Sequence, residues 1–263
     1  MSNNSHHQHQ LYHNIYSLCS IQVRYTIAIA SKPRDGLPPM QFQEVEVDLF
    51  NDGQLDEHFL TKVNRKGQVP ALTAPTLDKP MADSLEITHY LIEHYPDLTP
   101  KEHKDESLRL LRAVHALNYF ALSFPDRPHV VAGFVKSIND RLARDDISDE
   151  YRSALEYKLS VTNAEKVEGI RPEAVRANEE AARNLMKTCE ALLSEDAPWL
   201  FGSSRPTVLD AHLIIVLGRL QDVGRTAVVP DRLQRYADMA FATPELQSVM
   251  QGRRTMVPKS GST

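Results

Sequence analysis

The sequence has few cysteines and no apolar segment long enough to cross a membrane. Two of its 263 residues are cysteines, Cys19 and Cys189, and they form neither a disulfide framework nor a paired CxxC metal motif. The longest apolar stretch, residues 208–220, is interrupted by polar side chains and is too short to span a bilayer. These absences predict a soluble, cytoplasmic protein without a membrane partner.

The chain also lacks an excess of positive charge. Its formal net charge is −5 and its isoelectric point is about 6.1. A mildly acidic protein has no field that attracts a phosphate backbone, so nucleic acid is not expected as a partner. The hydrophobic fraction of 41% is sufficient for one large or two modest packed domains.

Both ends of the chain are polar. Residues 1–9 contain histidines at positions 6, 7 and 9, with no carboxylate or cysteine nearby to complete a metal site. We therefore expect a disordered tail there and no bound metal. Residues 253–263 are expected to form a second tail.

Residues 10–97 alternate between strand-like and helix-like patterns. Apolar and polar residues alternate over residues 42–48, and residues 71–73 follow a proline, so both stretches predict strands. Helical spacing predicts helices over residues 17–30 and 84–94. The order of elements predicts an α/β domain with a mixed four-stranded sheet.

The second part of the chain has a helical pattern throughout. Residues 98–104 are rich in proline and charge and are interpreted as a linker. Apolar residues at helical spacing then predict an all-helical domain over residues 105–252. Residues 136–170 are charged and weakly periodic, and we interpret them as an insertion that is helical in part.

Three hydroxyl or thiol residues, Ser17, Cys19 and Ser20, stand at the start of the first predicted helix. The amides and dipole of a helix N-terminus stabilise an anion such as a thiolate, to which a hydroxyl can also donate. The pKa of a thiol, about 8.5 when free, falls in such surroundings. A helix cap explains the serines equally well.

A second motif, GQVPAL at residues 67–72, has a proline at the entry of a strand. A cis peptide bond before Pro70 would turn the backbone of Val69 outward, where an extended peptide could pair with it. A trans proline that ends a loop is the commoner arrangement.

A third motif, at residues 81–87, has Asp83 or Ser84 at the start of a helix. The N–H groups and the hydroxyl there can bind a carboxylate, and the same residues can cap the helix. In the second domain, Thr207 and Asp210 have the spacing of a reciprocal N-cap, which is a structural signal.

Taken in order, these motifs resemble those of the glutathione transferases, from residue 10 to about residue 250 apart from the insertion. Residues 17–24, SLCSIQVR, resemble the serine-serine-cysteine signature of the zeta class, which includes the maleylacetoacetate isomerases. Residues 64–72 and 83–91 occupy the family's glutathione-site positions. The resemblance implies a thioredoxin-like first domain, a helical-bundle second domain, glutathione as co-substrate and a homodimer.

The resemblance also implies site residues. Ser17 aligns with the family's catalytic serine and Cys19 with the cysteine of the signature. The implied glutathione-binding residues are Gln68, Val69, Pro70 (cis), Asp83 and Ser84. The candidates that line a second-substrate pocket are His115, Tyr119, Phe120 and Phe124, for which ordinary core packing is an equally good explanation. The candidates for binding the glycyl carboxylate of glutathione are His58, Lys62 and Lys66.

Two departures from the zeta pattern matter. Leu18 replaces the second serine of the signature, which argues against maleylacetoacetate isomerase activity itself, and Asp83 stands where the zeta class has glutamine. The chain is thus similar to a divergent, fungal-type glutathione transferase, and the resemblance implies a role in detoxification or secondary metabolism.

Four functions agree with these motifs. The first is conjugation of glutathione thiolate to an apolar electrophile. The others are glutathione-dependent cis–trans isomerisation, monothiol reduction through Cys19, and a non-catalytic module with the transferase fold. A dithiol mechanism is excluded because no resolving cysteine follows Cys19.

Overall fold

The computed structural model describes residues 8–257, which form two compact units. The first, here called the sheet unit, comprises residues 8–14, 40–87 and 120–176. The second, the helical unit, comprises residues 15–39, 88–119 and 177–257. These units are assembled from separate stretches of the chain, and the domain boundaries predicted from the sequence remain a prediction.

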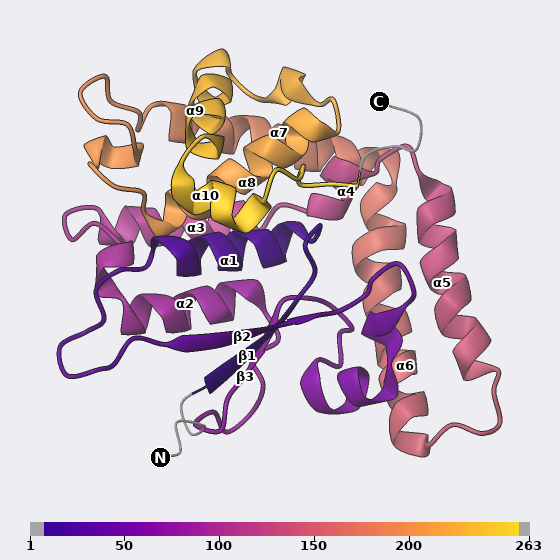
Figure 1. Ribbon diagram of the computed structural model, residues 1–263. Coiled ribbons are helices and arrows are strands. Elements are labelled where there is room, and N and C mark those ends of the chain that lie inside the picture. Colours follow the sequence, from indigo (N-terminus) through magenta and orange to yellow (C-terminus); the bar gives the residue numbers. More distant parts are fainter. Residues whose placement is uncertain (1–7, 258–263) are drawn as a thin grey trace. The chain divides into compact units, whose positions relative to one another are not determined.

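A small mixed sheet is the centre of the sheet unit (Figure 1). Its strands are β1 (Gln8–His13), β2 (Gln41–Glu46) and β3 (Ala71–Thr73). Strand β1 lies in the middle, parallel to β2 and antiparallel to β3. The mixed sheet and the position of β3 are therefore as predicted.

The prediction of a fourth strand is wrong, because the sheet formed by the described residues has three strands. Only an isolated bridge between Leu72 and Met81 stands in its place, with N–H···O=C bonds of 2.8 and 2.9 Å. Pro80 has no N–H to donate to a ladder. Helix α2 (Ser84–His94) begins three residues after Met81 and leaves no room for more pairs.

Parts of the predicted tails are ordered. The residue pair Gln8 and Gln41 begins the β1–β2 ladder, and the buried ring of His9 lies 5.4 Å from that of Phe42. At the other end Thr255 is fully buried, and its N–H and hydroxyl both donate to Asp222 at 2.7 Å. The rest of the predicted tails, residues 1–7 and 258–263, lies outside the described residues.

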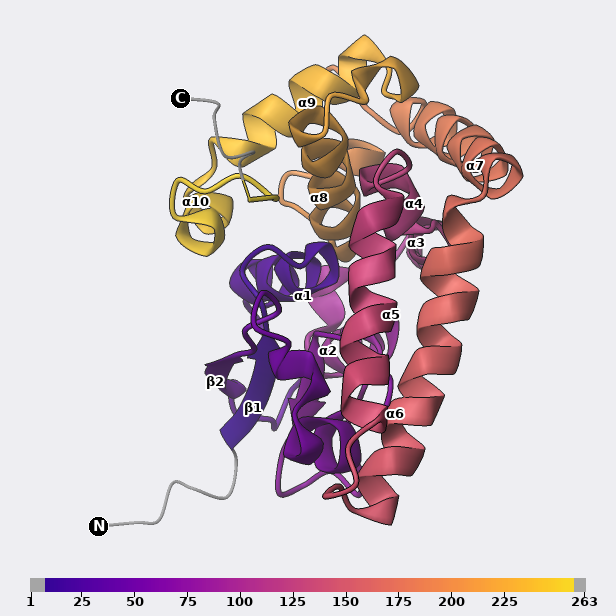
Figure 2. The same cartoon turned by 90° about the vertical axis from the view of Figure 1, so that its right-hand side faces the viewer.

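The predicted insertion is a helical hairpin. Helices α5 (Pro128–Leu142) and α6 (Asp149–Thr162) lie side by side in both views (Figures 1 and 2). The chain then continues through a π-helical turn (Asn163–Val167) and a 3-10 turn (Glu168–Ile170). The hairpin begins before residue 136 because Pro128, with its fixed φ, starts α5.

The hairpin shares a hydrophobic core with the segment that follows β2. This segment contains a 3-10 turn (Gly53–Leu55) and a π-helical turn (Phe59–Val63). The shared core consists of Leu55, Leu60, Ile138, Tyr151, Ala154 and Leu155. Because the hairpin buries its apolar face there, it belongs to the sheet unit.

The helical unit is built around α8 (Val208–Asp222). Every residue of α8 from Val208 to Leu220 is buried, as its apolar sequence predicts. Its neighbours in contact are α1 (Leu18–Ile29), α3 (Lys104–His115) and α9 (Asp231–Phe241). The remaining α-helices within residues 8–257 are α4 (Tyr119–Ser123), α7 (Pro172–Glu190) and α10 (Pro244–Met250).

The predicted reciprocal cap starts α8. The N–H of Thr207 donates to the Asp210 carboxylate at 2.7 Å, and Asp210 N–H donates back to the Thr207 hydroxyl at 3.5 Å. Burial raises the pKa of Asp210, and hydrogen bonds from Thr207 and Tyr236 oppose that rise. Between residues 8 and 257, no helix has the length and apolar content needed to cross a bilayer.

Candidate functional site

Ser17 and Cys19 lie at the N-terminus of α1, in the helical unit. Ser17 is the N-cap: its backbone is extended and its hydroxyl accepts a 3.3 Å hydrogen bond from Ser20 N–H. Both side chains are partly exposed, and Cys19 is in no disulfide. The first turn carries no acidic residue, so its amides and dipole are suited to an anion.

A buried arginine that the motifs did not indicate fixes the loop before this helix. Arg219 of α8 is 6% exposed and donates to the carbonyls of Tyr16 at 2.7 Å and Thr255 at 2.6 Å. Burial lowers the pKa of Arg219 to about 10, against the opposing influence of Asp222 and Cys19. The guanidinium is therefore charged at neutral pH. Its only sequence signal is a charged residue within the otherwise apolar run of residues 213–220.

The GQVPAL motif forms a tight loop in the sheet unit. The Val69–Pro70 peptide bond is cis, as the resemblance implies. Gly67 has a φ of +57°, and a Cβ there would lie 3.0 Å from the carbonyl oxygen of Gln54. Only glycine adopts this conformation at little cost, so Gly67 is required by the turn.

Asn64 joins this loop to the start of α2. Its side-chain amide donates to the carbonyl of Gln68 at 2.8 Å and to that of Ala82 at 3.3 Å. It thereby brings together the two segments that carry the predicted glutathione-binding residues. Asn64 is 2% exposed, and sequence reasoning did not single it out.

The Asp83 side chain caps the start of α2. Its carboxylate accepts from the N–H groups of Leu85 at 2.9 Å and Glu86 at 3.2 Å. The Asp83 side chain is exposed, whereas Ser84 is buried. The exposed carboxylate gives this helix start a negative charge that attracts an ammonium group. The backbone amides of the same helix start can bind a carboxylate.

Two side chains of the predicted insertion contact the loop, one from α6 and one from the π-helical turn after it. The ammonium of Lys158 donates to the Gly67 carbonyl at 3.0 Å. The Gln68 amide donates to the Glu165 carboxylate at 2.5 Å. The insertion therefore forms one wall beside the predicted glutathione loop.

One candidate for the glycyl carboxylate is already paired with the hairpin. The Lys62 ammonium lies 2.8 Å from the Glu150 carboxylate. The roles of His58 and Lys66 in binding the glycyl carboxylate of glutathione remain predictions.

His115 and Tyr119 make contacts typical of a bundle interior. His115 Nε2 lies 2.9 Å from Nδ1 of His212, which is fully buried. The Tyr119 hydroxyl donates to the Val114 carbonyl at 2.8 Å and accepts from the Gln22 amide at 3.3 Å. Both residues belong to the helical unit, whereas Phe120 and Phe124 belong to the sheet unit. A shared pocket for the four remains a prediction.

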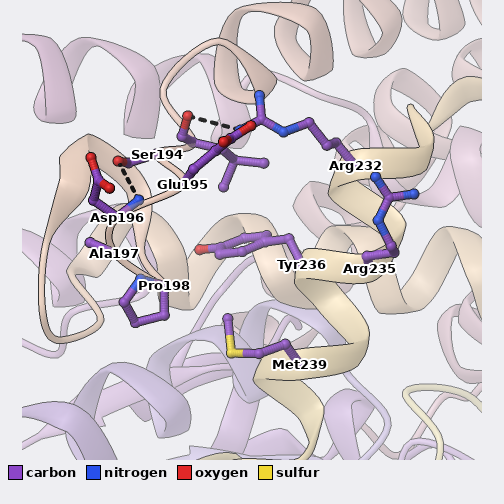
Figure 3. A pocket seen from close by; sticks show the side chains of 10 residues that line it. Ser194, Glu195, Asp196, Ala197, Pro198, Arg232, Arg235, Tyr236 and Met239 are labelled. Carbon is purple, nitrogen blue, oxygen red and sulfur yellow. Dashed lines mark hydrogen bonds between the residues drawn. The ribbon is translucent and has the colours of Figure 1, made fainter.

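The helical unit also has an open hollow of about 440 Å³. It lies between the loop after α7 and helix α9 (Figure 3), and it is lined by Leu193, Ser194, Glu195, Asp196, Ala197, Pro198, Arg232, Arg235, Tyr236 and Met239. Arg232 donates to the Leu193 carbonyl at 3.2 Å and braces the loop. No predicted site residue is among the lining residues. Within residues 8–257, no three metal-ligating side chains gather at one point.

Comparison with known families gives one match. Residues 35–101 match the model of the glutathione S-transferase N-terminal domain. This stretch includes the loop at Gln68 and the start of α2. Among curated proteins, none matches the chain.

Solved structures share the fold across nearly the whole chain. The β-etherase LigF from Sphingobium sp. has a TM-score of 0.63 at 19% identity, with 92% of this chain and 98% of that chain covered. A glutathione transferase family member from Pseudomonas fluorescens, solved with two glutathione bound, has a TM-score of 0.59 at 14% identity, with 94% of each chain covered. A bacterial maleyl pyruvate isomerase of the zeta class has a TM-score of 0.56 at 20% identity, with 91% and 95% covered. The chain therefore has the fold of these proteins, a thioredoxin-like part followed by helices.

Proposed function

We propose that this protein is a glutathione transferase that joins the glutathione thiolate to an electrophilic small molecule. The observation that carries the proposal is the pair of segments held together by Asn64, which lie within the stretch that matches the transferase N-terminal domain. Several structures of the same fold were solved with glutathione bound, which supports glutathione as co-substrate here. We also propose a cytoplasmic homodimer.

The proposed roles follow from the chemistry of each side chain. The backbone of the tripeptide would pair with that of Val69, and its γ-glutamyl end would bind at Asp83 and Ser84. The Asp83 carboxylate suits the ammonium of that end, and the α2 amides suit its carboxylate. The Ser17 hydroxyl would donate to the sulfur, and the first turn of α1 would stabilise the thiolate.

The reaction is a nucleophilic substitution or addition. The thiolate electron pair forms a carbon–sulfur bond, and in a substitution the leaving group departs with the electron pair of the bond that breaks. Holding both reactants in one orientation supplies much of the rate. No residue of the protein needs to change its covalent state.

Isomerisation is a second candidate, favoured by the zeta-like signature at residues 17–24. In that case the thiolate adds to a double bond and is eliminated after rotation, so glutathione is not consumed. Product analysis separates the two functions, because conjugation uses one glutathione per product. The zeta-class and fungal-type assignments, with a role in detoxification or secondary metabolism, remain part of this proposal.

The decisive experiment combines calorimetry with three variants. We expect wild type to bind glutathione, and Ser17→Ala to lower kcat/KM about tenfold to hundredfold through the lost hydrogen bond to a charged sulfur. Ser148→Ala is the matched control, because Ser148 caps α6 in the same way, with Tyr151 N–H donating to its hydroxyl at 3.1 Å. It should lose a cap, about 1 kcal/mol of stability, and keep activity.

Cys19→Ser separates the alternatives. Retained activity in Cys19→Ser together with loss in Ser17→Ala supports the serine mechanism. The reverse pattern assigns the chemistry to Cys19 and a monothiol route. A wild-type protein that neither binds glutathione nor consumes it with a panel of electrophiles contradicts the proposal and leaves a non-catalytic module.

A further inference from the structure

Three phenylalanines gather where α4 meets α5 in the sheet unit. The ring centroid of Phe120 lies 5.1 Å from that of Phe124 and 6.0 Å from that of Phe134. We call these three residues the Phe patch. All three rings are partly exposed, so a ligand can reach them. Such rings bind another aromatic ring by offset or edge-to-face contact.

Two cations lie over this patch. The ammonium of Lys166 lies 4.1 Å from the ring centroid of Phe134 and 5.2 Å from that of Phe120. The guanidinium of Arg127 lies 5.4 Å from the ring centroid of Phe124. Aromatic faces attract such cations, which holds both groups at the patch.

Neither cation is in an ion pair within residues 8–257, although the nearby charge of Glu165 favours the ammonium of Lys166. No ion pair joins Lys166 or Arg127 to an acidic side chain in that part of the chain. The neighbouring Glu165 accepts from the Gln68 amide. Burial lowers the pKa of Lys166 to about 8, so the ammonium is mostly charged at neutral pH.

Lys158 adds a second buried ammonium to the same segment. Its side chain is 4% exposed, and its hydrogen bond goes to the neutral Gly67 carbonyl. Burial and the charge of Lys166 lower its pKa to about 7. The charge of Glu165 favours both ammonium groups, so one carboxylate offsets two buried cations. The remaining positive charge costs stability, and a bound anion offsets that cost. Buried charged side chains that lower stability in this way are candidates for ligand binding.

We propose that the Phe patch, with Lys166 and Arg127, binds the second substrate through an aromatic ring and a carboxylate attached to it. The ring packs against the phenylalanines, and the carboxylate accepts from the ammonium and the guanidinium. That this ligand is the second substrate rests on the proposed function. The segment after α6 links the two sites, because Glu165 contacts the glutathione loop and Lys166 contacts the patch.

The binding test compares two probes, 4-nitrobenzoate and its neutral methyl ester. Calorimetry on the full chain measures the affinity for each. We expect wild type to bind the acid at least tenfold more tightly than the ester. Lys166→Met should weaken binding of the acid about tenfold to hundredfold and leave the ester unchanged, since a hydrogen bond to a charged group is lost. Phe134→Leu should weaken both.

Two variants guard against misfolding and general charge effects. Lys166→Arg keeps the charge and should retain most of the preference for the acid. Lys136→Met is the matched control, because Lys136 is an exposed lysine of α5 that pairs with Asp140. Equal binding of acid and ester by wild type, or equal effects of Lys166→Met and Lys136→Met, would overturn the proposal.

A separate arm distinguishes this proposal from the proposed function. Glutathione is titrated alone and in the presence of 4-nitrobenzoate. Failure to bind glutathione, with Lys166-dependent binding of the acid, contradicts the transferase function and leaves the subsite intact. Competition between the two ligands assigns Lys166 to a glutathione carboxylate and overturns the subsite. If both bind together, 4-chloro-3-nitrobenzoate should be conjugated with a higher kcat/KM than its methyl ester, and Lys166→Met should remove that difference.

Discussion

The guanidinium of Arg219 donates a 2.7 Å hydrogen bond to the carbonyl of Tyr16, the residue before the N-cap of α1. We expect Arg219→Met to remove the guanidinium hydrogen bonds to that carbonyl and to the carbonyl of Thr255. Each unsatisfied buried acceptor costs about 1–3 kcal/mol. Urea unfolding measures this loss, and kcat/KM with glutathione should fall as well, because the start of α1 is no longer held.

Arg205→Met is the control for this variant. Arg205 donates to the Ile29 carbonyl at the other end of α1, at 2.8 Å, and pairs with Asp97. It should lower stability and leave the activity per folded molecule unchanged. Equal losses of activity in the two variants would show that Arg219 acts only on stability.

Gly218 of α8 has no room for a side chain. A Cβ at this position would lie 2.4 Å from the ring of Phe241 at the end of α9. We expect Gly218→Ala to lower the free energy of unfolding by about 1–3 kcal/mol through overpacking, and Phe241→Leu to recover part of that loss in the double variant. Gly133→Ala on α5, where nothing lies within 4 Å, should instead stabilise by about 0.5–1 kcal/mol. Additive effects of Gly218→Ala and Phe241→Leu would contradict the clash.

His212 should make the protein less stable in acid. Burial, and then the charges of His115 and His89, hold the pKa of His212 well below 6.5. Below pH 6.5 the unfolded chain binds a proton that the folded chain does not, so stability falls as the pH falls, by up to about 1.4 kcal/mol per unit. His212→Gln removes this titration. Urea unfolding at pH 7.5 and 5.5 should show a smaller decrease for the variant, and equal decreases would contradict the assignment.

Lys158 should change stability in the same direction as His212, but over a higher pH range. Its pKa is about 7 when folded and near 10.5 when unfolded, since burial and then Lys166 disfavour the ammonium. Between these values only the unfolded chain is protonated, so wild type gains stability as the pH rises from 7 to 10.5 relative to Lys158→Met. Thermal unfolding at pH 6, 8 and 10 measures the difference, with Lys136→Met as a flat reference. A constant difference across this range would mean that Lys158 is not desolvated.

Local patterns in the sequence determined the elements that carry the proposed glutathione site. Strand β3 and helix α2 have the predicted bounds, and α8 starts at the predicted cap of Thr207 and Asp210. Proline placement, helical periodicity and capping act over a few residues, so they can be read without the fold. The same reasoning predicted a fourth strand that the proline before Met81 and the early start of α2 reduce to one bridge.

The tertiary structure alone decided which distant side chains contact the predicted site segments within each unit. Arg219 reaches a carbonyl 203 positions earlier, and Lys158 reaches Gly67 across 91 positions. The Phe patch likewise receives Lys166 from a segment that the sequence marked only as charged and weakly periodic. A local pattern records which face of a helix is apolar, whereas the partner of a buried charge depends on how distant segments pack.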